Sequence, residues 1–136
     1  FDLYCNNKLG FNPVATIQTT IEQINKVKAG QLVGYDRRFV ANKNIKVAVL
    51  PVGYADGFDM HYIGLNIDVD GKKCKVLNIC MDCFMLDVGN TPLKKGDKIY
   101  ILNPANPLSI YANHSSTSEY EVMCKFGSIR AERILY

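Results

Sequence analysis

The chain has 136 residues, 48% of them apolar and 21% charged, and a formal net charge of +3. This composition excludes a disordered or fibrous chain, and the length is that of one domain with a single core. The lysines are scattered along the sequence, so neither a nucleic acid nor an anionic membrane is an expected partner. No apolar stretch approaches the roughly 20 residues that cross a bilayer, and the first residues lack a signal-peptide pattern, which predicts a cytoplasmic location.

The first half of the chain has the alternation of strands. Residues 15–28 mix β-branched and polar residues and predict one long strand, with a helix as the rival interpretation. The turn at 28–31 contains Gly30, which takes a positive φ at little steric cost, and 32–41 is the expected returning strand. Residues 45–52 form a nearly continuous apolar run, which indicates a strand buried on both faces, and the loop 53–57 ends it.

The second half begins with the clearest local signal in the sequence. Asp70-Gly71 is a strong hairpin turn between the predicted strands 65–69 and 73–77. Further strands are expected at 80–88 and 98–102. Short helices follow, with Ser109 as the expected cap of one through Asn113, and Ser118 as the cap of a helix at 119–126 that Gly127 ends. The prediction is a mainly β domain, antiparallel and Greek-key or barrel-like, with one or two short helices.

Cysteine usage argues against cross-links and metals. Five cysteines, an odd number, occur in a chain large enough to need no disulfides, so we expect reduced thiols. Cys80 and Cys83 have the Cys-x-x-Cys spacing of zinc and redox sites. The other cysteines and both histidines are dispersed, however, and no metal site is predicted.

Three segments, at 32–39, 50–58 and 79–88, together resemble the alanine racemase family. The most specific are the Val-Gly-Tyr-Ala-Asp-Gly loop at 52–57 and the Cys-Met-Asp sequence at 80–82, in the order and spacing of that family. The chain is similar to the C-terminal β-domain of these pyridoxal 5'-phosphate (PLP) enzymes over nearly its whole length. Because it starts at Phe-Asp-Leu-Tyr-Cys without an initiator Met, we expect residues 1–10 to be the end of the preceding barrel and 11–136 to be the β-domain.

The resemblance implies an isomerase that interconverts L- and D-alanine for cell-wall peptidoglycan, working as a head-to-tail homodimer. The β-domain of one subunit would then cover the cofactor on the N-terminal barrel of the other. Two acid/base groups are required, and by resemblance the second is Tyr35, which as an isolated tyrosine beside arginines would more often be a packing residue. Tyr54 matches a residue lining the substrate access route, and Met81 matches one whose backbone N–H holds the substrate carboxylate. Asp82 and Arg37 are expected to support them.

Several positions depart from the family pattern. Asp36 stands where Gly is common, Asn78 where Arg is frequent, and Met60 where some members have a channel Arg. Ile129 replaces a Tyr that reaches the cofactor phosphate in some members. By resemblance, Asn78 and Met60 are expected to change the electrostatics of substrate access, Asp36 is compatible with the turn because Asp tolerates left-handed backbone, and Ile129 cannot donate the bond to the phosphate.

Other interpretations remain open at this point. The chain could be a non-catalytic β-barrel module for binding or dimerisation, which would tolerate replacement of Tyr35, Tyr54 and Met81. It could also belong to a racemase for serine or another amino acid. Without a barrel lysine, the chain alone is expected neither to bind PLP detectably nor to racemise alanine.

Overall fold

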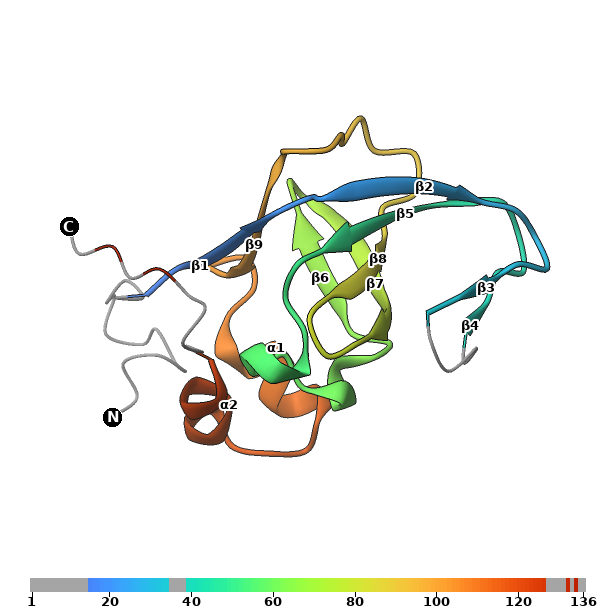
Figure 1. Ribbon diagram of the computed structural model, residues 1–136. Helices are drawn as coiled ribbons and strands as arrows, with labels where there is room; N and C mark the ends of the chain where they lie inside the picture. Colours follow the sequence, from blue (N-terminus) through green and yellow to red (C-terminus); the bar gives the residue numbers. More distant parts are fainter. Residues whose placement is uncertain (1–14, 35–38, 127–131, 133, 135–136) are drawn as a thin grey trace.

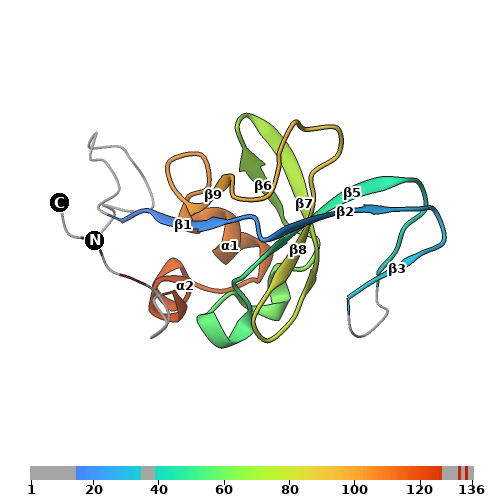
Figure 2. The same ribbon diagram turned by 45° about the horizontal axis from the view of Figure 1, so that its top comes forward.

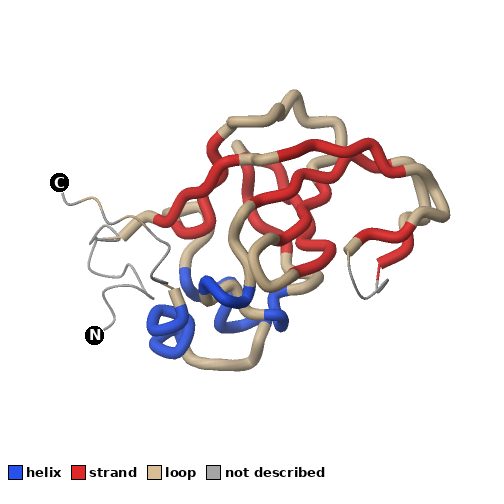
Figure 3. The backbone as a smooth tube through the Cα atoms, viewed as in Figure 1, coloured by secondary structure: helices blue, strands red, loops and turns tan. Residues whose placement is uncertain are grey.

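The computed structural model describes residues 15–34, 39–126, 132 and 134. In this part of the chain, antiparallel strands fill one side of the molecule and the helical segments gather at one end of them (Figures 1 and 3). The strands are β1 (Ile17–Thr20), β2 (Gln23–Val27), β3 (Leu32–Val33), β4 (Phe39–Val40), β5 (Ile45–Leu50), β6 (Asn66–Val69), β7 (Lys72–Ile79), β8 (Phe84–Asp87) and β9 (Lys98–Leu102). The predicted boundary after residue 10 lies outside the described residues.

The largest sheet has the order β2-β5-β8-β7-β6, with every pair antiparallel. Short connections join β6, β7 and β8, and β5 lies beside β8, which is a Greek-key order. The long connection from β5 to β6 contains two 3-10 turns, η2 (Tyr54–Asp56) and η3 (Met60–Tyr62). The predicted mainly β, antiparallel Greek-key fold is therefore confirmed.

The single strand predicted for 15–28 is wrong in one respect, because two strands occupy this stretch. β1 pairs with β9, and β2 pairs with β5. Between them Ile21 is buried, and its N–H donates to the Asp97 carbonyl at 2.9 Å, while the Glu22 N–H donates to the Val49 carbonyl at 3.0 Å. The chain thus changes partners at Ile21, which makes a corner between two sheets and excludes the rival helix.

Asn106 connects β6, an edge strand of the largest sheet, with β9 of the two-stranded sheet. Its fully buried side-chain amide donates to the carbonyls of Asp68 in β6 and Tyr100 in β9, at 2.8 and 3.0 Å. Its side-chain oxygen accepts the Asp68 N–H at 2.6 Å. The side chain therefore bridges β6 and β9 where no backbone ladder joins them, which gives the strands a barrel-like arrangement.

The returning strand expected at 32–41 is a separate hairpin. Leu32 pairs with Val40 and Val33 with Phe39, and this hairpin projects from the body of the molecule (Figures 1 and 2). The predicted pairing is wrong: β2 pairs with β5, with Val27 opposite Ile45, whereas β3 pairs with β4. Gly30 has the predicted positive φ, of 86°.

The Asp70-Gly71 hairpin is confirmed. Both residues have positive φ, 52° and 80°, and Val69 pairs with Lys72 directly across the turn. β7 is longer than expected, and β8 is shorter than 80–88 because residues 80–83 form a turn, in which the Cys80 N–H donates to the Cys83 carbonyl at 2.7 Å. β9 has the predicted bounds.

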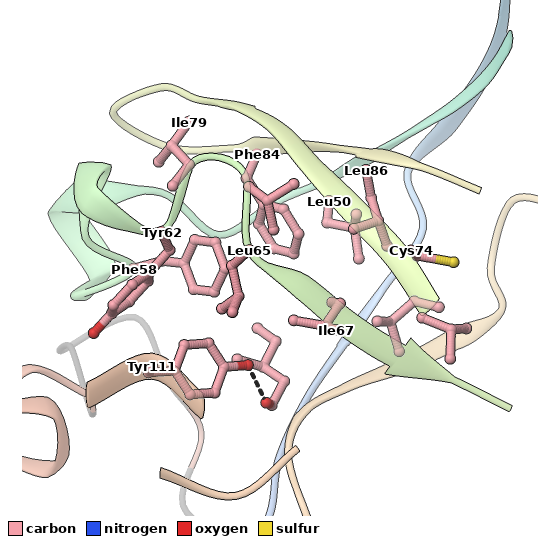
Figure 4. Close-up of a cluster of buried hydrophobic side chains, with 14 of the residues drawn as sticks. Leu50, Phe58, Tyr62, Leu65, Ile67, Cys74, Ile79, Phe84, Leu86 and Tyr111 are labelled. Carbon is pink, nitrogen blue, oxygen red and sulfur yellow. Dashed lines mark hydrogen bonds between the residues drawn. The ribbon is translucent and has the colours of Figure 1, made fainter. Parts of the chain in front are cut away.

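The main core lies between the large sheet and the helices, and it is rich in aromatic side chains (Figure 4). Phe58 stacks on Phe84 with ring centroids 4.3 Å apart, and Tyr62 meets Tyr111 edge to face at 5.0 Å. Offset and edge-to-face arrangements are those that aromatic quadrupoles favour. The Tyr111 hydroxyl donates to the Ile101 carbonyl in β9, so the buried phenol keeps a hydrogen-bond partner.

A smaller second cluster covers the opposite face of the sheet. It contains Val33, Ala41, Ile45, Val47 and Leu77. Since Ala48 and Leu50 belong to the main core, β5 is buried on both faces, as predicted.

The helices are α1 (Leu108–His114) and α2 (Glu119–Lys125). Ser118 caps α2 as predicted, because its side-chain oxygen accepts the Glu121 N–H at 3.2 Å. The predicted cap Ser109 is wrong, because α1 begins at Leu108 and its N-cap is Pro107, two residues earlier. Proline is well suited to a helix start because its missing N–H would have no partner there. Gly127 lies outside the described residues.

Candidate functional site

The loop at 53–57 is held in shape by its own residues. The Gly53 N–H donates to the Asp56 carboxylate at 2.9 Å, and Gly57 has a φ of 90°. A Cβ on Gly57 would overlap the Lys125 carbonyl, so only glycine allows α2 to approach this closely. Phe58, directly after the loop, is fully buried and fixes it to the core.

Two backbone hydrogen bonds join this loop to the turn at 80–83. The Tyr54 N–H donates to the Cys80 carbonyl and the Ala55 N–H to the Met81 carbonyl, both at 3.0 Å. A Cβ on Gly53 would overlap both carbonyls, so glycine is needed for the two segments to meet. The structure therefore brings together the two segments that carry the most specific sequence motifs.

Tyr54 and Met81 lie on the surface of this junction. Half of Tyr54 and 56% of Met81 are exposed. Among the described residues, the Met81 N–H has no hydrogen-bond partner, while its carbonyl is used by Ala55. An exposed amide of this kind can receive a carboxylate oxygen.

Asp82 and Cys83 complete the turn. The Cys83 thiol neighbours Cys80 and Asp82 in this turn. Burial, and after it the neighbouring Cys80 and Asp82, raise the pKa of Cys83 to about 12, so the thiol stays protonated at neutral pH. Neither cysteine is in a disulfide. A thiol with this pKa is a poor nucleophile, and Asp82 is the charged group of the turn.

The remaining motif segment, 32–39, is joined to β7 through Asn78. This side chain is 2% exposed, and its amide donates to the Val33 carbonyl at the end of β3, at 3.2 Å. Tyr35, Asp36 and Arg37, which follow in the sequence, lie outside the described residues, as does Ile129. In the sequence, Asn78 is only a departure from a family pattern, and no sequence pattern indicates that this residue is buried.

The flank of the site contains an ion-pair cluster that the sequence did not indicate. The Asp59 carboxylate accepts the His61 N–H at 2.9 Å and the Lys125 ammonium at 2.7 Å, and Glu121 contacts the same ammonium at 2.8 Å. These bonds tie the 53–59 connection to α2. Met60, noted as a departure, is partly buried against the main core in η3.

Burial alone would raise the pKa of Asp59, but the hydrogen bonds from His61 and Lys125 outweigh it and hold this pKa well below its ordinary value. The hydrogen bond to Asp59, and next the one to Glu121, raise the pKa of Lys125. Asp59 and Lys125 are therefore both charged at neutral pH.

No group of three or more potential metal ligands occurs among the described residues. In the same part of the chain, neither helix is long and apolar enough to span a membrane.

Comparison with known proteins decides the family. The family model described as "Alanine racemase, C-terminal domain" matches residues 14–135. The chain belongs to this family. The alanine racemase of Staphylococcus carnosus is 38% identical over 122 residues, which are 85% of this chain and 32% of that protein. The chain thus spans about a third of the length of the curated relatives it matches.

Solved structures of alanine racemases share the fold. That from Acinetobacter baumannii superposes with a TM-score of 0.82 at 31% identity, covering 90% of this chain and 35% of that one. The alanine racemase of Bartonella henselae, described with covalently bound pyridoxal phosphate, has a TM-score of 0.77 at 24% identity, covering 83% and 33%. The alanine racemase C-terminal domain assignment therefore rests on sequence and fold together.

Proposed function

We propose that this chain is the part of an alanine racemase that supplies the second acid/base group and part of the substrate pocket. The observation that carries the proposal is the joined pair of motif segments, 53–57 and 80–83, which presents Tyr54 and the Met81 amide on one exposed surface. Family membership supports it. The barrel of a second subunit would cover this surface in a head-to-tail homodimer, with a free amino acid as substrate.

The residues of the surface have distinct proposed tasks. The Met81 N–H donates to one oxygen of the substrate carboxylate and orients the α-carbon, and the exposed Tyr54 ring narrows the access route. The Asp82 carboxylate, next to the protonated Cys83, is the negative charge of the turn and supports its conformation. None of these groups removes a proton.

PLP fits this arrangement as a cofactor held mainly by the other domain. The described surface offers an amide donor and an aromatic wall toward a substrate, but no cluster of groups suited to enclosing a phosphate. When bound in the complete enzyme, PLP supplies the electron sink for the negative charge left on the α-carbon.

Tyr35 is the proposed base on this chain. A phenol has an ordinary pKa of about 10, so it accepts a proton near pH 7 only when cations and hydrogen bonds stabilise the phenolate. Arg37, two residues along the sequence, is the proposed cation of this chain, and further donors would come from the barrel. Tyr35 removes the α-proton of one enantiomer or returns a proton to that face.

The test is racemisation of L-alanine by the complete enzyme with Tyr35→Phe, followed by circular dichroism of the amino acid. We expect the rate to fall about 10²- to 10⁴-fold, the usual contribution of a positioned acid/base group. Tyr100→Phe is a matched control on β9, where the side chain is partly exposed and remote from the motif segments, and its rate should be unchanged. An unchanged rate in Tyr35→Phe contradicts the assignment and favours a non-catalytic module.

Substrate choice is tested on the same enzyme. L-serine and other small amino acids are compared with L-alanine under identical conditions. We expect alanine to have the highest kcat/KM, and a higher value for serine would reassign the enzyme while keeping the two-base proposal.

A further inference from the structure

A β-bulge in β7 turns Asn78 away from the main core. Val76 and Ile79 both belong to that core although three positions separate them, an odd interval that regular alternation does not allow. The register of β7 against β8 shifts between Val76 and Asn78, which is where the extra residue enters. Bulges of this kind re-aim side chains and are frequent next to active sites.

The bulge sends Asn78 toward the β3-β4 hairpin. Leu77 lies in the second cluster with Val33, and the strand partner of Asn78 is Met85, which packs against the same cluster. A polar side chain that is 2% exposed among these apolar residues requires hydrogen-bond partners. It finds them on two segments at once.

One partner lies on another segment, and the other is the next residue of the same strand. The Asn78 side-chain amide donates to the Val33 carbonyl at 3.2 Å, and its oxygen accepts the Ile79 N–H at 2.8 Å. The first bond holds the end of β3, and the second holds the strand end that leads into the turn at 80–83. One side chain therefore links the two segments.

Gly34 fits against the same side chain. Its φ is 86°, and a Cβ at this position would overlap the Asn78 amide. Glycine thus satisfies two requirements here, the left-handed backbone and the close approach. The contact leaves little freedom in the distance between β7 and the last described residue before Tyr35.

We propose that Asn78 is a positioning residue, which fixes the backbone entering Tyr35 relative to the carboxylate-binding turn at Met81. The inference rests on the proposed function of Tyr35 and deepens it. Asn78 touches neither substrate nor cofactor. It acts by setting where the chain leaves β3, and a misplacement of about 1 Å at a reacting group costs on the order of a hundredfold in rate.

The test compares two aspartate substitutions in the complete enzyme. Asn78→Asp keeps the shape and the acceptor for Ile79 but replaces the donor to the Val33 carbonyl with an oxygen. Asn106→Asp makes the same chemical change at an equally buried asparagine between β6 and β9. A defect that comes only from lost stability affects both variants alike. The comparison therefore separates the effect of the Asn78 position from general destabilisation.

The first measurement is amide hydrogen exchange, read by mass spectrometry on the peptide covering 30–41. We expect faster exchange in Asn78→Asp and wild-type exchange of this peptide in Asn106→Asp. Unchanged exchange in Asn78→Asp overturns the positioning role whatever the enzyme catalyses. Gly34→Ala, which disturbs the same contact from the other side, should reproduce the faster exchange.

The second measurement separates the two bases. In D₂O, each enantiomer of alanine is assayed both for racemisation and for exchange of its α-hydrogen without inversion. When only the Tyr35 face is impaired, the other base still exchanges the hydrogen of one enantiomer, so the ratio of exchange to racemisation rises. We expect racemisation in Asn78→Asp to fall about tenfold to a hundredfold and this ratio to rise, as in Tyr35→Phe.

The outcomes are distinguishable. A raised ratio in Tyr35→Phe with a wild-type ratio in Asn78→Asp overturns the proposal for Asn78 alone. A wild-type ratio in Tyr35→Phe contradicts the proposed function of Tyr35, and the exchange of the 30–41 peptide then decides whether Asn78 positions this segment. A raised ratio in Asn106→Asp shows that general destabilisation is sufficient, which also overturns the proposal.

Discussion

Asn78 and Asn106 are chemically identical and almost equally buried, yet they connect different parts of the structure. Asn78 ties β3 to the strand end before Cys80, whereas Asn106 ties β6 to β9. In both cases an amide supplies a donor and an acceptor in one plane, which no hydroxyl or carboxylate can reproduce. At the scale of single residues, buried asparagines thus replace backbone ladders where strands do not pair.

Asn106→Ala should destabilise the chain by about 2–4 kcal/mol. The change leaves the N–H and carbonyl of Asp68 and the carbonyl of Tyr100 without this partner. All three bonds are partly buried, so each loss costs about 1 kcal/mol, near the low end for an unsatisfied group. Urea unfolding measures the difference. Asn66→Ala, at an exposed position on β6, is the control and should change stability by less than about 0.5 kcal/mol. Equal effects of the two substitutions would contradict the bridging role.

At the scale of elements, the long connection between β5 and β6 is held from both ends. Its first part joins the turn at 80–83 through backbone hydrogen bonds, and its second part joins α2 through Asp59 and Lys125. Gly57, between them, allows the close approach to the end of α2. The conformation of the Tyr54 loop therefore depends on α2, although α2 lies far away in the sequence.

The Asp59–Lys125 pair predicts a pH dependence of stability. The pKa of Asp59 is below its ordinary value of 3.8 in the folded chain, so its contribution is fully present above that value and is lost as the pH falls through the lower, folded pKa. We expect wild-type stability to exceed that of Asp59→Asn at pH 6, and the difference to shrink below about pH 4. Urea unfolding at a series of pH values measures it.

Glu121→Gln is the control for this experiment. It removes the exposed partner of Lys125 and leaves the bonds of Asp59 in place. Its stability should follow the wild-type pH dependence closely, since exposed ion pairs contribute little. A difference between wild type and Asp59→Asn that stays constant from pH 6 to pH 2 would show that the pair has no electrostatic role.

At the scale of the whole molecule, the proposed function makes the exposed surface of this chain one part of a site. Tyr54 and Met81 are exposed on a surface that no described segment covers, and the projecting β3-β4 hairpin exposes Leu32 and Val40. Exposed apolar groups of this kind mark surfaces that another chain or domain covers. The chain spans about a third of the length of the relatives it matches. Under the proposed function, the barrel of a second subunit covers this surface.

The isolated chain should therefore neither bind PLP specifically nor racemise alanine. We expect no saturable, stoichiometric absorbance near the Schiff-base band after incubation with PLP and dialysis, and no change in the optical rotation of L-alanine. The complete enzyme is the positive control for both measurements. A saturable band that persists after dialysis, or racemisation by the chain alone, would show that the site is complete without the barrel.

Much of the fold followed from local patterns. The Asp70-Gly71 hairpin, β9, the two-sided burial of β5 and the Ser118 cap each depend on residues close together in the sequence, and the structure confirms them. Partner choice did not follow. The sequence predicted that 15–28 pairs with 32–41 across the turn at Gly30, whereas in the structure β2 pairs with β5 and β3 pairs with β4.

The sequence by itself determined the family, the fold class and the motif residues Tyr54, Met81 and Asp82, because these are encoded in short segments of specific composition. The tertiary structure alone decided that the 53–57 loop and the 80–83 turn share backbone hydrogen bonds. It also decided that Asn78 is buried against β3, through a bulge that no alternation pattern reveals. The physical reason is that burial and hydrogen-bond partners depend on segments distant in sequence, whose packing fixes what each side chain can reach.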